Sequence, residues 1–148
     1  MKSITLWDKE PDNWNCPCCS RSKSALIRQT KNNERIGHLH EHHDHILDYP
    51  NHLLKEQFEA DWNKVLESKY PGADHFRSGL CRFVQRFPNE VICQDCNVAE
   101  GAAKQKIAAD RFFSFAPPEI AQIIIATPNE KHGIKNLVAA NIWKTRQE

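Results

Sequence analysis

The sequence lacks the segments that place a protein in a membrane or send it out of the cell. Although 40% of its 148 residues are hydrophobic, no run approaches the roughly 18 apolar residues that span a bilayer. The first ten residues, MKSITLWDKE, have no apolar stretch of the signal-peptide kind. We therefore expect a cytoplasmic protein with no membrane partner, folded as one domain over residues 1–148.

The chain also has little net charge, +1 at pH 7, so its bulk charge does not indicate a nucleic-acid-binding protein. Its basic residues nevertheless cluster in RSKSALIRQTKNNER, residues 21–35, while EPD and EQFEAD carry acidic residues elsewhere. A basic face on a nearly neutral protein remains compatible with DNA as a partner. Repeats, low-complexity tracts and linkers are absent too, which favours a compact α+β fold with little strand.

The spacing of the cysteines is the strongest indication of a metal site in the sequence. Six cysteines without an export signal favour metal binding over disulfides. Four of them form two C-x-x-C knuckles, Cys16 with Cys19 and Cys93 with Cys96. Two knuckles supply the four thiolates of a tetrahedral structural zinc site. Cys18 is an alternative to Cys19, which we prefer because a C-x-C turn holds a metal less comfortably.

The expected elements surround these knuckles. SALIRQT, residues 24–30, reads as a strand, and the histidine-rich segment 38–47 as the strand that returns beside it. Apolar residues at helical spacing predict a helical insertion over about 51–87. FPNEVIC leads back to the second knuckle, and a helix follows in which Asn97 and Glu100 have the spacing of a capping box. C-terminal helices are expected over about 117–146.

The segment HLHEHHDHILDYP, residues 38–50, holds five of the eight histidines. Strand alternation places His43 and His45 on one side, and His42 and Asp44 on the other. If one zinc clamps both knuckles, the helix after the second knuckle packs on the strands and brings Asn97 close. A metal ligand, a histidine base and an asparagine at one point form an arrangement for metal-assisted phosphodiester hydrolysis.

Two boxes carry a resemblance to a known family. HHDH at residues 42–45 is similar to a DHDH box, and CQDCNVAEG at 93–101 is similar to a C-x-x-C-N-x-A-E-G segment. Together they resemble the HNH (ββα-metal) nucleases, in particular the zinc-stapled branch that includes phage recombination endonuclease VII. The resemblance covers roughly residues 14–48 and 88–110. The chain departs from the pattern at His42, where the branch has aspartate, and in the long segment between the boxes.

The resemblance implies a ββα-metal core stapled by a four-cysteine zinc site, and a DNA endonuclease that uses one Mg²⁺ or Mn²⁺ ion. Two alignments fit. In one, His42 is a metal ligand and His43 the general base; in the other, Asp44 is the ligand and His45 the base. Asn97 is a metal ligand in both. The sequence leaves the two alignments open, while the resemblance favours His43 as the base, with His45 contacting phosphate or supporting the base.

A second class of function also fits the sequence, a non-catalytic zinc-ribbon module that binds nucleic acid. It predicts that the histidine segment is dispensable. For a nuclease with one centre, a homodimer is one way to cut both strands of a duplex. Restriction, junction cleavage and nicking remain open as substrate choices.

Overall fold

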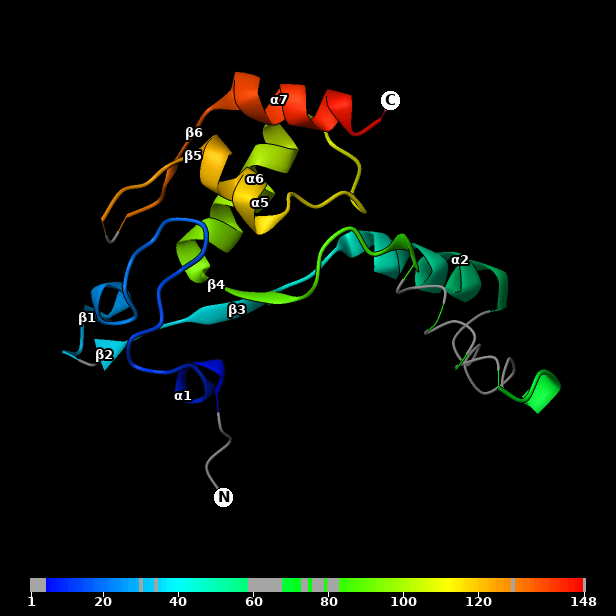
Figure 1. Ribbon diagram of the computed structural model, residues 1–148, viewed down its shortest axis with the longest axis horizontal. Helices are drawn as coiled ribbons and strands as arrows, with labels where there is room; N and C mark the ends of the chain where they lie inside the picture. The colour runs from blue at the N-terminus through cyan, green and yellow to red at the C-terminus, as the bar shows by residue number, and fades with distance from the viewer. Residues whose placement is uncertain are drawn as a thin grey trace.

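The computed structural model describes residues 5–29, 31–33, 35–58, 68–72, 75, 79, 83–128 and 130–147. It is a mixed α/β fold with small antiparallel sheets, drawn in Figure 1. A large part of the predicted helical insertion over 51–87, namely residues 59–67, 73–74, 76–78 and 80–82, lies outside the described residues. Its described beginning belongs to α2, Asp48–Phe58.

The N-terminal part builds the first knuckle. Helix α1, Leu6–Lys9, is capped by Thr5, whose backbone N–H and hydroxyl both donate to the Asp8 carboxylate, at 3.0 and 2.7 Å. After the knuckle come η1, Ser24–Leu26, and the short pair β1, Arg28–Gln29, with β2, Arg35–Ile36. The strand expected over 24–30 is therefore a 3₁₀ turn followed by two paired residues.

The central element is the antiparallel pair of β3, Leu39–His42, and β4, Glu90–Cys93. Leu39 lies opposite Cys93, and His42 lies opposite Glu90. The histidine segment thus pairs with the strand before the second knuckle, and not with residues 24–30 as the sequence suggested. It leaves the sheet after His42 because Asp44 caps η2, His45–Leu47, by accepting the Ile46 N–H at 3.3 Å.

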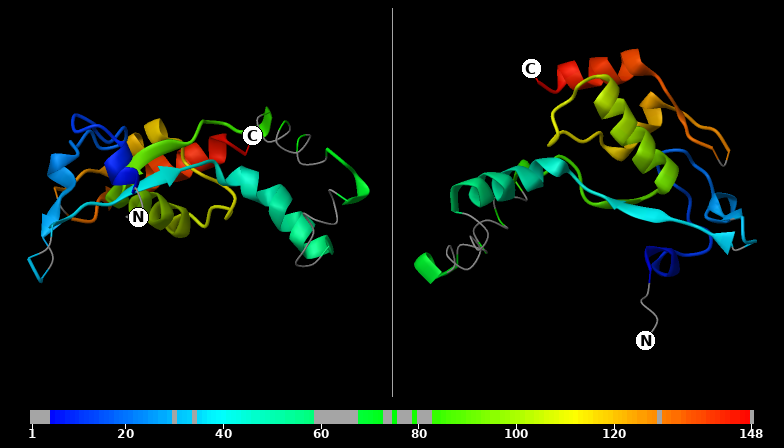
Figure 2. Two further views of the ribbon diagram at one scale, coloured as in Figure 1. Left: turned by 90° about the horizontal axis from the view of Figure 1, so that it is seen from below. Right: turned by 180° about the vertical axis from the view of Figure 1, so that it is seen from behind.

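Helix α5, Gln94–Lys106, follows β4 without a loop and has Cys93 as its N-cap. The predicted capping box was wrong, because the helix begins before Asn97. Glu100 is buried and accepts the Phe115 N–H at 3.3 Å. Small side chains at Ala99 and Ala103 let neighbouring elements approach the helix closely. Figures 1 and 2 show α5 between the β3–β4 pair and the later helices, with which it makes contact on both sides.

The C-terminal part contains α6, Pro117–Ile123, and α7, Asn136–Thr145. Helix α6 begins where Pro117 presets the first turn and the Glu119 carboxylate accepts the Ala116 N–H at 2.8 Å. A hairpin of β5, Ile124–Ile125, and β6, Gly133–Ile134, separates the two helices. The sequence did not predict this hairpin. Three of the four isoleucines within residues 117–126 complete the core: Ile120, Ile123 and Ile124 are buried, and Ile125 is exposed.

One apolar core joins these parts. Its largest fully buried apolar side chains come from β4, the loop before α6, and α6 itself, namely Ile92, Phe115, Ile120 and Ile123. In the described part of the chain, no helix is both long and apolar enough to cross a bilayer. The core therefore fixes α5 against β3 and β4, the elements that carry the candidate sites.

Candidate metal centre and active site

The four cysteines of the two knuckles converge in one buried cluster. Their sulfur atoms all lie within 4.8 Å of one another, and the set consists of Cys16, Cys19, Cys93 and Cys96. The sulfur atoms of Cys16 and Cys96 are 3.8 Å apart, and those of Cys19 and Cys93 are 3.7 Å apart. Metal–sulfur bonds of about 2.3 Å in a tetrahedron require sulfur–sulfur edges of about 3.8 Å. The cluster therefore has the geometry of a tetrahedral metal site, and Cys19, not Cys18, belongs to it.

Local backbone geometry presents these sulfur atoms. In the first knuckle, the Ser20 N–H donates to the Cys16 carbonyl at 2.8 Å, and Ser20 adopts a left-handed conformation with φ of 59°. In the second knuckle, Cys93 ends β4 and Cys96 lies in the first turn of α5. The strand-to-helix junction therefore supplies the second pair without an intervening loop.

A second cluster lies just beyond the other end of β3. It consists of His43, His45 and Asp48, whose potential ligand atoms also lie within 4.8 Å of one another. The Asp48 Oδ2 is 3.1 Å from the His45 Nδ1 and 3.4 Å from the His43 Nε2, and the two imidazole rings are 4.6 Å apart. The side chains are 39%, 35% and 50% exposed in sequence order. This cluster is open to solvent.

Two hydrogen bonds of the loop before α6 hold this cluster in place. The Ser114 hydroxyl accepts the His45 N–H at 3.0 Å, and the Ser114 carbonyl accepts from Arg86 at 3.1 Å.

Burial, together with the positive charge of Lys104, lowers the pKa of His45 below its usual value of 6.5, although the Asp48 hydrogen bond acts in the opposite direction. His45 is therefore neutral at pH 7. With its Nδ1–H directed at Asp48, its Nε2 carries a free lone pair.

His42 points away from this cluster. It is 2% exposed, and its Nε2 lies 2.7 Å from the Phe115 carbonyl oxygen. Because that oxygen only accepts, the imidazole donates through Nε2. The ring also stacks on Phe87, with centroids 5.4 Å apart and planes 12° from parallel. Burial lowers the pKa of His42. The structure thus brings His43 and His45 together and leaves His42 in the core.

Asp44 is likewise engaged elsewhere. It is fully buried and accepts three hydrogen bonds from Arg86, from the backbone N–H at 2.9 Å, from Nε at 3.0 Å and from Nη2 at 2.6 Å. Burial raises the pKa of Asp44, but the bonds to Arg86 outweigh it and lower the pKa overall. Asn97 is half-buried in the first turn of α5. The roles of these two residues and of His42 as ion ligands remain predictions.

Asp48 is the member of the cluster that the sequence reasoning missed. The available signal was its position three residues after His45, from which a carboxylate can reach back to the preceding turn.

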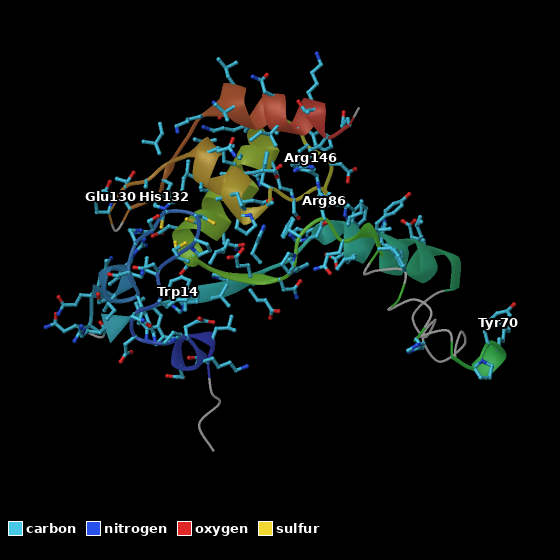
Figure 3. The ribbon with its side chains drawn as sticks, in the orientation of Figure 1. Trp14, Tyr70, Arg86, Glu130, His132 and Arg146 are labelled. Atoms are coloured by element: carbon cyan, nitrogen blue, oxygen red, sulfur yellow. The ribbon has the colours of Figure 1, made fainter. Side chains whose placement is uncertain are left out.

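A groove adjoins the open cluster at Ile46. It has a volume of about 260 Å³ and is lined by Ile46, Arg86, Asp110, Phe112, Phe113, Trp143, Arg146 and Gln147. Figure 3 shows Arg86 and Arg146 reaching this region from different parts of the chain. Next to the groove, Tyr49 contacts Phe112 edge-on at 4.9 Å, and Arg111 stacks over Phe112 at 4.7 Å. Aromatic faces and guanidinium groups therefore lie together beside His45.

No family model, curated protein or solved structure matches this chain.

Proposed function

We propose that the protein is a metal-dependent phosphodiester hydrolase that cleaves DNA, with a structural zinc ion in the four-cysteine cluster and its reaction at His43, His45 and Asp48. The observation that carries the proposal is the open cluster, two half-exposed imidazoles that share one carboxylate. Structural metal sites have all four positions filled by protein, whereas catalytic sites keep access for solvent and substrate. The cysteine cluster is of the first kind and the histidine cluster of the second.

In the proposed mechanism, His45 is the general base. Asp48 orients the ring through Nδ1, so that Nε2 accepts a proton from the attacking water. A lowered pKa keeps the base neutral at pH 7. This assignment favours the second of the two alignments left open by the sequence for the base, and it gives Asp48 the orienting role.

The resemblance implies a divalent ion, and His43 with the Asp48 carboxylate would hold it. When bound, such an ion stabilises the negative charge that develops on the phosphate. Imidazole nitrogen suits transition metals better than Mg²⁺, which prefers oxygen ligands. The donor set therefore favours Mn²⁺ over Mg²⁺ as the more active ion.

The groove beside His45 supports a nucleic-acid substrate. Arg86 and Arg146 line the groove, although each is already paired with a carboxylate, Asp44 and Glu119 respectively. The exposed Arg111, stacked over Phe112, places a guanidinium group beside the groove for a backbone phosphate. The exposed Tyr49 ring and the Phe112–Arg111 stack provide faces on which unpaired bases can stack. DNA with an unpaired or branched segment near the scissile bond therefore suits this surface best.

Cleavage of supercoiled plasmid and of a branched oligonucleotide, with Mn²⁺, with Mg²⁺ and with a chelator, tests the proposal. We expect cleavage with Mn²⁺, weaker cleavage with Mg²⁺ and none with the chelator. For a variant that loses a histidine of the cluster, such as His45→Ala, the matched control is His38→Ala. His38 is an exposed histidine of the same segment that lies outside the cluster. DNA binding without cleavage under every metal condition would instead favour the non-catalytic zinc-ribbon module.

The products also report on assembly. If two copies pair on DNA as a homodimer, linear plasmid follows the open circle, because two centres then face the two antiparallel strands. A single copy that nicks one strand stops at the open circle.

A further inference from the structure

The side chain of Arg21 lies against the four-cysteine cluster. Its Nε donates to the Cys19 Sγ at 3.3 Å, and its Nη2 donates to the Cys93 Sγ at 3.4 Å. One guanidinium thus bridges sulfur atoms from different knuckles. Within the described residues it makes no such bond to Cys16 or Cys96, and Cys16 accepts the backbone N–H of Cys93 instead, at 3.4 Å. Among the described residues, Arg21 therefore donates hydrogen bonds to two of the four sulfur atoms, those of Cys19 and Cys93.

Arg21 is held firmly in this position. Its side chain is 12% exposed, and its Nη2 donates to the Asp95 Oδ2 at 2.7 Å. Asp95 lies inside the second knuckle and also pairs with Arg28. Although burial raises the pKa of Asp95, the two arginines lower it overall, so the carboxylate is charged. His132, which Figure 3 labels beside the cluster, has its Nε2 3.4 Å from the same Arg21 Nη2.

The four cysteines differ in how far they are exposed to solvent. Cys16, Cys93 and Cys96 are at most 1% exposed, whereas Cys19 is half-buried. Four thiolates around one divalent ion carry a net charge of roughly −2, and that charge makes the sulfur atoms nucleophilic. A reagent in solution therefore meets Cys19 first, at the sulfur atom that the Arg21 Nε covers.

We propose that Arg21 protects the metal site chemically, by withdrawing charge from the Cys19 and Cys93 sulfur atoms and by occupying the approach to Cys19. Hydrogen bonds and a positive charge near a thiolate reduce its reactivity and slow the loss of the ion. The inference rests on the zinc assignment of the proposed function, but not on catalysis.

The test is the rate of zinc release to a coloured chelator while the folded protein reacts with iodoacetamide. In that reaction a thiolate sulfur attacks the carbon that bears iodine, so that a carbon–sulfur bond forms and iodide leaves. We expect Arg21→Met to release zinc about tenfold faster than the wild type. Peptide mass mapping should show the acceleration at Cys19 and Cys93, with Cys18, a buried thiol outside the cluster, unchanged.

Arg28→Met is the matched control, because Arg28 pairs with Asp95 but donates no hydrogen bond to a sulfur atom among the described residues. This variant should release zinc at the wild-type rate. Arg21→Lys keeps the positive charge but not the planar guanidinium that reaches two sulfur atoms, so we expect an intermediate rate of zinc release. This variant carries the test if Arg21→Met does not fold. Equal rates for the wild type and both Arg21 variants, or an acceleration spread evenly over all cysteines, would overturn the proposal. A wild-type protein without zinc would instead contradict the zinc assignment.

Discussion

The two clusters of metal-ligating side chains differ most in how far water reaches them. Three of the four cysteines are at most 1% exposed, whereas the side chains of His43, His45 and Asp48 are between 35% and 50% exposed. The cysteine cluster supplies four sulfur atoms at tetrahedral spacing. The histidine cluster supplies three atoms of mixed type and leaves room for a substrate. Under the proposed function, the closed site holds the fold together and the open site meets a substrate.

Strand β3 connects the two sites. Leu39 at its start pairs with Cys93 of the cysteine cluster, and His42 at its end immediately precedes His43. Three residues of strand span about 10 Å. A metal ion that clamps the knuckles therefore also fixes the pairing of β3 with β4, and through it the position of the open cluster.

The largest expected effect concerns the closed site. Cys93→Ser should unfold much of the protein, because binding of a structural zinc ion contributes on the order of 10 kcal/mol to folding. Circular dichroism and metal analysis would show the loss of structure together with the loss of about one zinc ion per chain. Cys18→Ser is the control, since Cys18 lies outside the cluster and its variant should keep the ion. A folded, metal-free Cys93→Ser protein would refute the structural role.

A smaller loss of stability is expected at Asp44. Asp44→Ala leaves the Arg86 guanidinium without its buried partner, and breaking such a pair costs about 3–5 kcal/mol. Denaturant unfolding should show this loss, while cleavage per folded molecule at low temperature remains close to wild type. The opposite result would be full stability with no cleavage. It would indicate that Asp44 is an ion ligand, as in the alignment that makes Asp44 the ligand and His45 the base.

The open site predicts a particular pH dependence. A base works when it is neutral, so cleavage should fall as the pH drops through the pKa of His45. Because burial and Lys104 lower that pKa, the midpoint of the acidic limb should lie below 6.5. Lys104→Met should move the midpoint upward, as measured by cleavage rates between pH 5 and 8 with saturating Mn²⁺. A midpoint above 6.5 in the wild type would speak against His45 as the base.

The smallest effect is expected at Glu100, in the core between the two sites. Burial raises its pKa, so the stability linked to its protonation is present below about pH 4 and is lost as the pH rises through the folded-state pKa. Glu100→Gln removes that loss and still accepts the Phe115 N–H. Thermal unfolding should show a gain for the variant that is larger at pH 8 than at pH 5. A gain of equal size at both pH values would contradict this reading.

The sequence predicted the closed site well and the open site only in part. Two C-x-x-C knuckles specify a thiolate cluster because each brings its own pair of sulfur atoms, whatever the chain does between them. The open cluster depends on where β3 ends. Strand alternation separated His43 and His45 from His42 and Asp44, but it could not show that Arg86, far along the chain, occupies the Asp44 carboxylate. It also gave no sign that the 3₁₀ turn after Asp44 brings Asp48 back to His45.

The pairing of β3 with β4, instead of with residues 24–30, escaped prediction for a related reason. Segment 24–30 and segment 90–93 are both short and apolar enough to form a strand, so local pattern alone does not choose between them. The choice follows from the four-cysteine cluster, which brings the end of β4 to the first knuckle. The hairpin between α6 and α7 lies in a run of isoleucines that suits either helix or strand.

The central claim, that a closed structural site supports a separate open reactive site, is tested most directly by His45→Ala measured for zinc and for plasmid cleavage in the same preparation. We expect about one zinc ion per chain, a wild-type circular dichroism spectrum, and a cleavage rate with Mn²⁺ lower by about 10²- to 10⁴-fold. Cleavage at the wild-type rate by a protein that keeps its zinc would contradict the claim.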